Sequence, residues 1–164
     1  MWTKHQPLTV IRFLGTSADS SSLIPLLTSL CHQISLHHSL PLDAVPTEPL
    51  PIINFFSSLM SRASTCHCPL LIFLDSLDML SPADGAHLLA WFPASLPPHC
   101  KLVASVVTSH DVIVRRLRSL TQNILYVDDM GTELAIRVVN GWLTNAGRTV
   151  TADQLDIIQS ALRK

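Results

Sequence analysis

The sequence predicts an α/β fold in which helices cover a parallel β-sheet. Apolar, strand-like segments alternate along the chain with segments of helical periodicity, a pattern that indicates a parallel sheet. Residues 70–74 form an unbroken apolar run, as expected for a strand buried on both faces, and Asp75 follows directly. Ligands of such folds bind at the carboxyl ends of the strands, so Asp75 and nearby Asp78 mark the candidate site.

The composition sets broad limits on the kind of protein. A chain of 164 residues is long enough for one domain with a sizeable core. Hydrophobic residues make up 48% and charged residues 14%, so we expect a piece of a larger body whose other parts cover apolar surface. The alternative is a soluble monomer with an adhesive surface. A net charge of -1 predicts neither nucleic acid nor membrane as a partner. Four scattered cysteines predict a reduced, cytoplasmic protein without a disulfide scaffold.

The first half of the chain predicts two strands and two helices. Residues 8–14 favour a strand because β-branched and aromatic side chains are frequent there. A helical stripe follows, formed by Leu23, Leu26, Leu27, Leu30, Cys31 and Ile34. Four prolines in residues 37–51 predict an exposed loop. The buried side of the second predicted helix comprises Ile52, Ile53, Phe55, Phe56, Leu59, Met60 and Ala63.

The second half predicts further strands and helices. Ser81-Pro82-Ala83-Asp84 is typical of a helix start, and this helix should end by Pro93. Residues 101–107 and 124–127 are expected to form a third and a short fourth strand, separated by a helix that Asp111 caps. Two helices are expected to end the chain. The first runs from Gly131 to about Ala146, and the second follows a capping box at residues 151–154.

The order of these segments resembles NACHT-type NTPase domains, which are STAND-class P-loop proteins, and most of all those of vertebrate NACHT and WD-repeat proteins. Residues 13–34 are similar to the second strand and helix of such domains, and residues 71–78 to their Walker B segment, which binds magnesium. The resemblance implies a parallel-sheet P-loop NTPase core at 1–130, from the second strand onward. Residues 131–164 would begin the helical domain that follows such cores.

The resemblance also implies missing parts. In such domains a first strand, a phosphate-binding loop and a first helix precede the segment that corresponds to residues 8–14. The loop motif G-x-x-x-x-G-K-[ST] does not occur in these 164 residues. The absent strand normally lies between the third and fourth predicted strands. We therefore expect exposed sheet edges, through which the chain associates with itself or with protein partners.

Site roles follow from the resemblance. Asp75 would hold Mg²⁺ through water, and Asp78 would polarise or orient the attacking water. Ser105 or Thr108 would sense the γ-phosphate of the nucleotide. Met79 stands where relatives often have glutamate, which weakens the expectation of hydrolysis. Mg²⁺ and ATP or ADP are thus the cofactors expected of an intact parent, and this chain alone should bind neither nucleotide tightly. The alternative is that both aspartates only cap the following turn.

Three functions fit these observations. The chain is predicted to be part of a nucleotide-dependent signalling or scaffold NTPase. The alternatives are a non-catalytic protein-interaction module and an incomplete gene product. Cys66-His67-Cys68 could contribute to a metal site, with Cys31, His32 or the pair His37–His38 as further ligands. The spacing lacks the two separated ligand pairs of a zinc module, so a surface turn is favoured.

Overall fold

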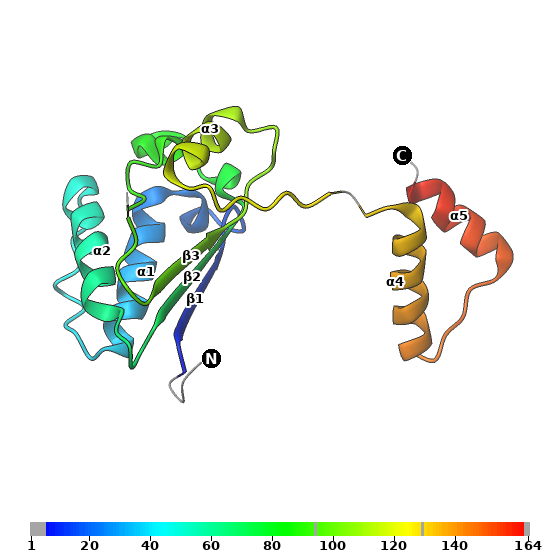
Figure 1. The fold of residues 1–164 in the computed structure, drawn as a ribbon, viewed down its shortest axis with the longest axis horizontal. Coiled ribbons are helices and arrows are strands. Elements are labelled where there is room, and N and C mark those ends of the chain that lie inside the picture. Colours follow the sequence, from blue (N-terminus) through cyan, green and yellow to red (C-terminus); the bar gives the residue numbers. More distant parts are fainter. Residues whose placement is uncertain (1–5, 94, 129, 163–164) are drawn as a thin grey trace. The chain divides into compact units, whose positions relative to one another are not determined.

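The structure, a computed structural model, describes residues 6–93, 95–128 and 130–162. It divides the chain into two units, Met1–Gln122 and Asn123–Lys164. The first unit contains a parallel sheet of three strands in the order β1-β2-β3 (Figure 1). These strands are β1 (Leu8–Phe13), β2 (Leu70–Asp75) and β3 (Cys100–Ala104). The predicted α/β class with a parallel sheet is therefore confirmed.

One face of the sheet is covered by α1 (Leu23–His37) and α2 (Pro49–Ala63), which pack against each other (Figure 1). The apolar stripe predicted for α1 is buried, and Leu27, Leu30 and Ile34 have no exposed surface. Residues of this kind each contribute about 1.5–3 kcal/mol to stability when fully buried. The loop before α2 ends earlier than predicted because Pro49 and Pro51 lie in the first helical turn, where backbone N–H groups have no partner within the helix.

Within the first unit, the opposite face of the sheet carries an exposed apolar row. Ile11 pairs with Phe73, and Phe73 pairs with Val103, so these three side chains form one row across the strands. Ile11 is 49% exposed and Val103 is 50% exposed, whereas Phe73 is partly buried. The prediction that β2 is buried on both faces is therefore wrong for its outer face. Parallel sheets are normally covered on both sides, so this row marks a surface on which another element can pack.

The segment after β2 is less regular than predicted. A 3-10 segment at Ala83–Leu88 takes the place of the helix expected from Ser81 to Pro93. Shorter 3-10 turns lie before it at Leu77–Met79 and before α1 at Asp19–Ser21. Asp84 and Leu89 adopt left-handed backbone angles, with φ of 55° and 50°, which interrupt helical hydrogen bonding. The indole of Trp91 is nonetheless buried, and its Nε1–H donates to the carbonyl of Ala86 at 3.0 Å.

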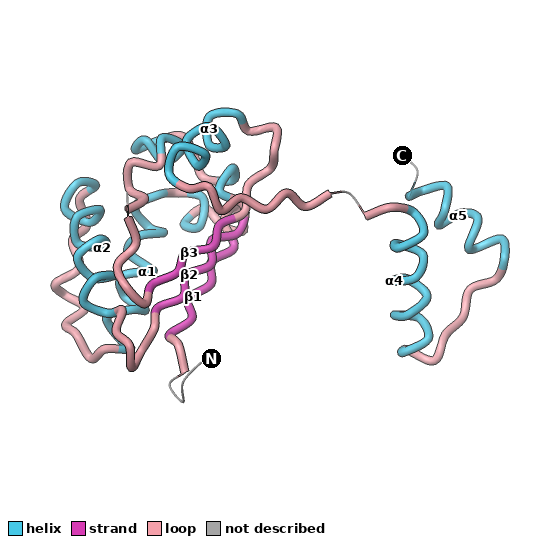
Figure 2. The backbone as a smooth tube through the Cα atoms, viewed as in Figure 1, coloured by secondary structure: helices cyan, strands magenta, loops and turns pink. Residues whose placement is uncertain are grey.

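The predicted third strand is shorter than expected, and the predicted fourth strand is absent. β3 ends at Ala104 instead of Val107. The predicted helix is confirmed as α3 (Asp111–Leu120), which buries Ile113, but its N-cap is His110 instead of Asp111. Residues 124–127 form a loop, which Figure 2 draws in pink. Leu125 is 86% exposed there, and Val127 is 88% exposed. A strand needs a neighbour for its backbone N–H and C=O groups, and the described part of the second unit contains no other strand.

The second unit consists of two helices that pack against each other, α4 (Thr132–Asn145) and α5 (Ala152–Leu162). Gly147 lies between them with φ of 67°, as expected for a residue that ends a helix. The predicted capping box is confirmed. Thr151 N–H donates to Gln154 Oε1 at 3.0 Å, and Gln154 N–H donates to Thr151 Oγ1 at 3.3 Å. The assignment of 131–164 to a following helical domain stays a prediction.

Candidate functional site

Asp75 and Ser105 meet at the carboxyl edge of the sheet. Asp75 is the last residue of β2, and Ser105 comes directly after β3, its neighbouring strand. The hydroxyl of Ser105 donates to Oδ1 of Asp75 at 2.5 Å and accepts from the backbone N–H of Ser76 at 2.7 Å. Hydrogen bonds to a charged acceptor are short and strong, so Ser105 holds the carboxylate in one orientation. The structure therefore brings together the predicted metal ligand and one predicted nucleotide sensor.

A sharp turn after β2 positions Asp78. Ser76 adopts a left-handed conformation with φ of 65° and ψ of 62°, which is unfavourable by about 1–2 kcal/mol for a residue with a side chain. The 3-10 turn that follows brings Oδ1 of Asp78 within 3.1 Å of the backbone N–H of Val107, which donates to it. The hydrogen bonds described for the two aspartate side chains do not go to backbone N–H groups of this turn. Both carboxylates instead bind groups that follow β3, which differs from the turn-capping alternative.

The other predicted sensor does not join this cluster. Thr108 lies in an exposed turn before α3, and its side chain makes no hydrogen bond to either aspartate. Val107 takes part through its backbone, a role that its apolar side chain does not signal in the sequence. The cluster at the carboxyl edge thus comprises Asp75, Ser76, Asp78, Ser105 and the N–H of Val107, which we call the carboxyl-edge site.

The donor groups of the carboxyl-edge site suit a hard cation. Asp75 is exposed, and its described hydrogen bond uses only Oδ1, so Oδ2 remains available. The hydrogen bond described for Asp78 likewise uses only Oδ1. Carboxylate oxygens reached through water are a common way to bind Mg²⁺, which gives up its hydration shell reluctantly. The residues present therefore fit the cation that the sequence predicts.

Two of the cysteines are buried and poorly suited to nucleophilic chemistry. Burial raises the pKa of the Cys31 thiol to about 12 and that of the Cys100 thiol to about 11. A thiol acts as a nucleophile after losing its proton, so both remain unreactive near neutral pH.

A surface hollow of about 760 Å³ lies along α1, lined by residues that include Arg12 and His32. Neither Asp75 nor Asp78 lines it.

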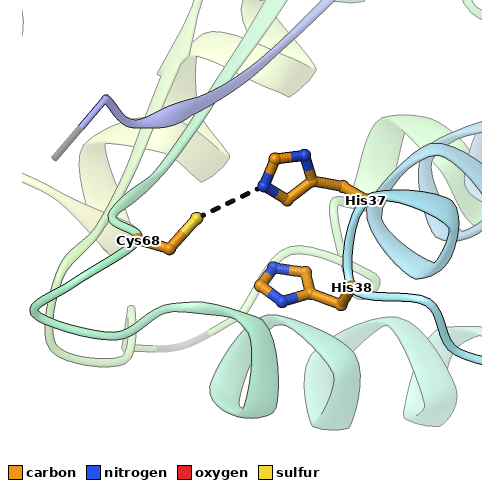
Figure 3. Close-up of side chains that lie close together, drawn as sticks. All are labelled: His37, His38 and Cys68. Carbon is orange, nitrogen blue, oxygen red and sulfur yellow. Dashed lines mark hydrogen bonds between the residues drawn. The ribbon is translucent and has the colours of Figure 1, made fainter.

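A second cluster of ligand-type side chains lies at the opposite edge of the sheet. His37 and His38 at the end of α1 lie close to Cys68, which precedes β2 (Figure 3). Among the candidate further ligands, the histidine pair lies beside Cys68, whereas Cys31 is buried in the core. Among the described residues, none of the helices combines the length and apolarity that crossing a membrane requires.

Comparison with known proteins finds relatives of this chain. It is 30% identical over 164 residues to human NACHT and WD repeat domain-containing protein 2, an alignment that covers 98% of this chain and 9% of that protein. It is 35% identical over 106 residues to human NACHT domain- and WD repeat-containing protein 1, covering 62% of this chain and 7% of that protein. The chain thus spans less than a tenth of the length of these curated relatives. No protein-family model matches the chain, and no solved structure matches it.

Proposed function

Because this chain is a NACHT-related segment, homologous over nearly its whole length to part of the NACHT and WD repeat domain-containing proteins, we propose that it is part of a nucleotide-dependent signalling or scaffold NTPase. The carboxyl-edge site carries the proposal. Asp75 ends the central strand of a parallel sheet, where P-loop NTPases hold their magnesium ion, and Ser105, directly after the adjacent strand, fixes its carboxylate.

Each residue of the site has a role in the proposal. Asp75 holds Mg²⁺ through water, and Asp78 orients the water that attacks the γ-phosphate. Ser105 contacts the nucleotide from β3, and Thr108 is a second candidate for that contact. When bound, Mg²⁺ neutralises charge on the β- and γ-phosphates. These 164 residues contain no phosphate-loop motif, so we propose that they bind ATP or ADP weakly. The four cysteines are free, which is compatible with the cytoplasmic location we propose.

The nucleotide proposal is tested by calorimetric titration of the full chain with Mg·ATP and Mg·ADP. We expect weak, saturable binding that requires Mg²⁺ and that Asp75→Asn weakens about tenfold or more, because a charged ligand to the hydrated ion is lost. The matched control is Asp43→Asn, which changes an exposed aspartate in the loop before α2 and should leave affinity unchanged. Binding without Mg²⁺, or binding that Asp75→Asn does not affect, would contradict the proposal. Absence of any binding at millimolar nucleotide would favour the next candidate.

The second candidate is a non-catalytic interaction module, and the open face of the sheet favours it. Ile11, Phe73 and Val103 form an apolar row that no described element of the first unit covers fully, and β1 and β3 are both edge strands of the described sheet. Exposed apolar patches and unpaired strand edges mark surfaces where proteins associate. A second copy of the chain or a larger NACHT-containing protein would pack there.

For this module we expect the isolated chain to elute as a dimer or larger species in size-exclusion chromatography with light scattering. Replacing Ile11 and Val103 by lysine should yield a monomer, because two charges would be buried in the interface. The control is Leu36→Lys, which places a single lysine on α1 at a side chain that is 69% exposed and should leave the association unchanged. If the double variant still elutes as a dimer or larger species, the contact between copies lies at the strand edges instead. A wild-type monomer at tens of micromolar would argue against the module.

A further inference from the structure

The histidine–cysteine cluster is formed by two segments far apart in the sequence. His37 is the last residue of α1, and His38 follows it at the helix end. Cys68 lies two residues before β2, and the packing of α1 against the sheet brings the end of the helix beside it. Figure 3 shows both imidazole rings turned toward the Cys68 side chain. One potential ligand atom from each of the three residues lies within 4.8 Å of the other two.

The separation of these atoms is close to that of a tetrahedral zinc site. Zinc binds cysteine sulfur at about 2.3 Å and histidine nitrogen at about 2.0–2.1 Å, so a tetrahedral angle sets the S···N distance at about 3.6 Å. Sγ of Cys68 lies 3.5 Å from Nε2 of His37. The other two pairs of ligand atoms lie within 4.8 Å, so they have to approach by at most about 1.5 Å to reach the separations of a tetrahedral site. None of the three side chains is fully buried, which leaves room for them to rotate.

An unsatisfied nitrogen in the cluster supports a ligand there. Nε2 of His38 is shielded from solvent and has no hydrogen-bond partner. A shielded polar atom without a partner destabilises the fold, because it has lost its hydrogen bond to water. A metal ion at the cluster would satisfy the imidazole as a ligand or orient it. The donor set of one thiolate and two imidazoles matches borderline-soft zinc better than magnesium or calcium, which prefer oxygen.

We propose that His37, His38 and Cys68 bind one Zn²⁺ ion, with water in the fourth position. The Cys68 thiol releases its proton to solvent as the ion binds, because the thiolate is the metal ligand. The ion joins the end of α1 to the segment that leads into β2. This site is independent of the carboxyl-edge site and does not depend on nucleotide binding. Zinc at saturating concentration stabilises the first unit and raises its melting temperature by roughly 5–10 °C.

The full chain, fused to a solubility partner that lacks metal-binding residues and carrying no polyhistidine tag, provides the test. We expect one Zn²⁺ per chain and, with Co²⁺ in its place, the absorption of a tetrahedral ion with a thiolate charge-transfer band. Cys68→Ser should abolish that band and weaken zinc binding at least tenfold. The matched control, Cys66→Ser, alters the exposed cysteine two positions earlier and should change neither. On the histidine side, His37→Asn should weaken binding, whereas His32→Asn on the exposed surface of the same helix should not.

Several results would overturn the proposal. The first is a wild-type chain that takes up no Zn²⁺. The second is a cobalt spectrum that does not change in Cys68→Ser. The third is an equal loss of zinc affinity in the Cys66→Ser and Cys68→Ser variants. The last result would place the ion on the whole Cys66–Cys68 segment instead. Circular dichroism of each variant without metal shows whether it is folded, so loss of binding through unfolding is recognised. For any variant that does not fold, the stoichiometry and cobalt spectrum of the wild-type chain still decide the outcome.

Discussion

Replacing Phe56 by alanine is expected to lower the free energy of unfolding by about 3–5 kcal/mol. Phe56 has no exposed surface and lies in the core formed with α1 and the sheet. Truncation removes buried apolar area and leaves a cavity that the surrounding side chains fill only in part. Domains of this size are stable by about 5–15 kcal/mol, so this one change removes a large share of the total. Urea denaturation followed by circular dichroism measures the loss.

The neighbouring Phe55 provides the matched control for this experiment. It carries the same side chain in the same helix but is only partly buried. Phe55→Ala should therefore lower the free energy of unfolding by about 1 kcal/mol, in proportion to its smaller buried area. Equal losses for the two variants would show that α2 buries a different face from the one observed. A larger loss of unfolding free energy for Phe55→Ala than for Phe56→Ala would mean that Phe55, and not Phe56, faces the core.

Gly15→Ala is expected to destabilise the first unit by about 2–5 kcal/mol through two separate effects. Gly15 follows β1 with φ of 76°, a conformation that is unfavourable by about 1–2 kcal/mol for residues with a Cβ atom. An added Cβ would also lie 2.6 Å from Cβ of Met79, and such overpacking costs about 1–3 kcal/mol. The Met79 Cβ is fixed by its own backbone, so the collision is relieved only if one of the two segments moves.

Gly85 separates the two effects. Its φ of 69° is nearly the same, but a Cβ there would meet its nearest atom, Cδ1 of Leu88, at an ordinary 3.9 Å. Gly85→Ala should therefore show the conformational cost alone, about 1–2 kcal/mol. A double-mutant cycle with Met79→Gly measures the collision directly as a coupling energy. If the two alanine variants lose the same stability, the close approach of Gly15 to Met79 is not present in solution.

Most regular elements of the fold could be predicted because their periodicity is strong. The stripe of α1, the apolar run of β2 and the capping box of α5 each depend on local side-chain patterns. The segment after β2 could not be predicted in the same way, because the left-handed backbone of Asp84 and Leu89 interrupts the helix expected there. These residue types rarely adopt that conformation, and only tertiary packing selects it. Residues 124–127 have strand-like composition, but composition does not supply a hydrogen-bonding neighbour.

The candidate site shows the same division between local pattern and tertiary contact. Asp75 could be located because it directly follows an apolar strand, and Ser105 because it follows the next one. The bond from Val107 N–H to Asp78 was not predictable, because backbone groups leave no mark in the sequence. His37, His38 and Cys68 come from segments whose approach depends on how α1 packs on the sheet. The sequence suggested this set only as one of several groups of ligands.

The pairing of the strands also determines the order in which this chain can fold. Leu8 pairs with Leu70, and Leu70 pairs with Cys100, so both contacts join residues that are distant along the chain. Helices α1 and α2 lie between the first pair and form from local contacts. Their hydrophobic faces therefore emerge from the ribosome before β2 has been synthesised, and β1 cannot form its pairing with β2 until then. Closing such long loops slows folding, so β1 is an aggregation-prone segment during synthesis.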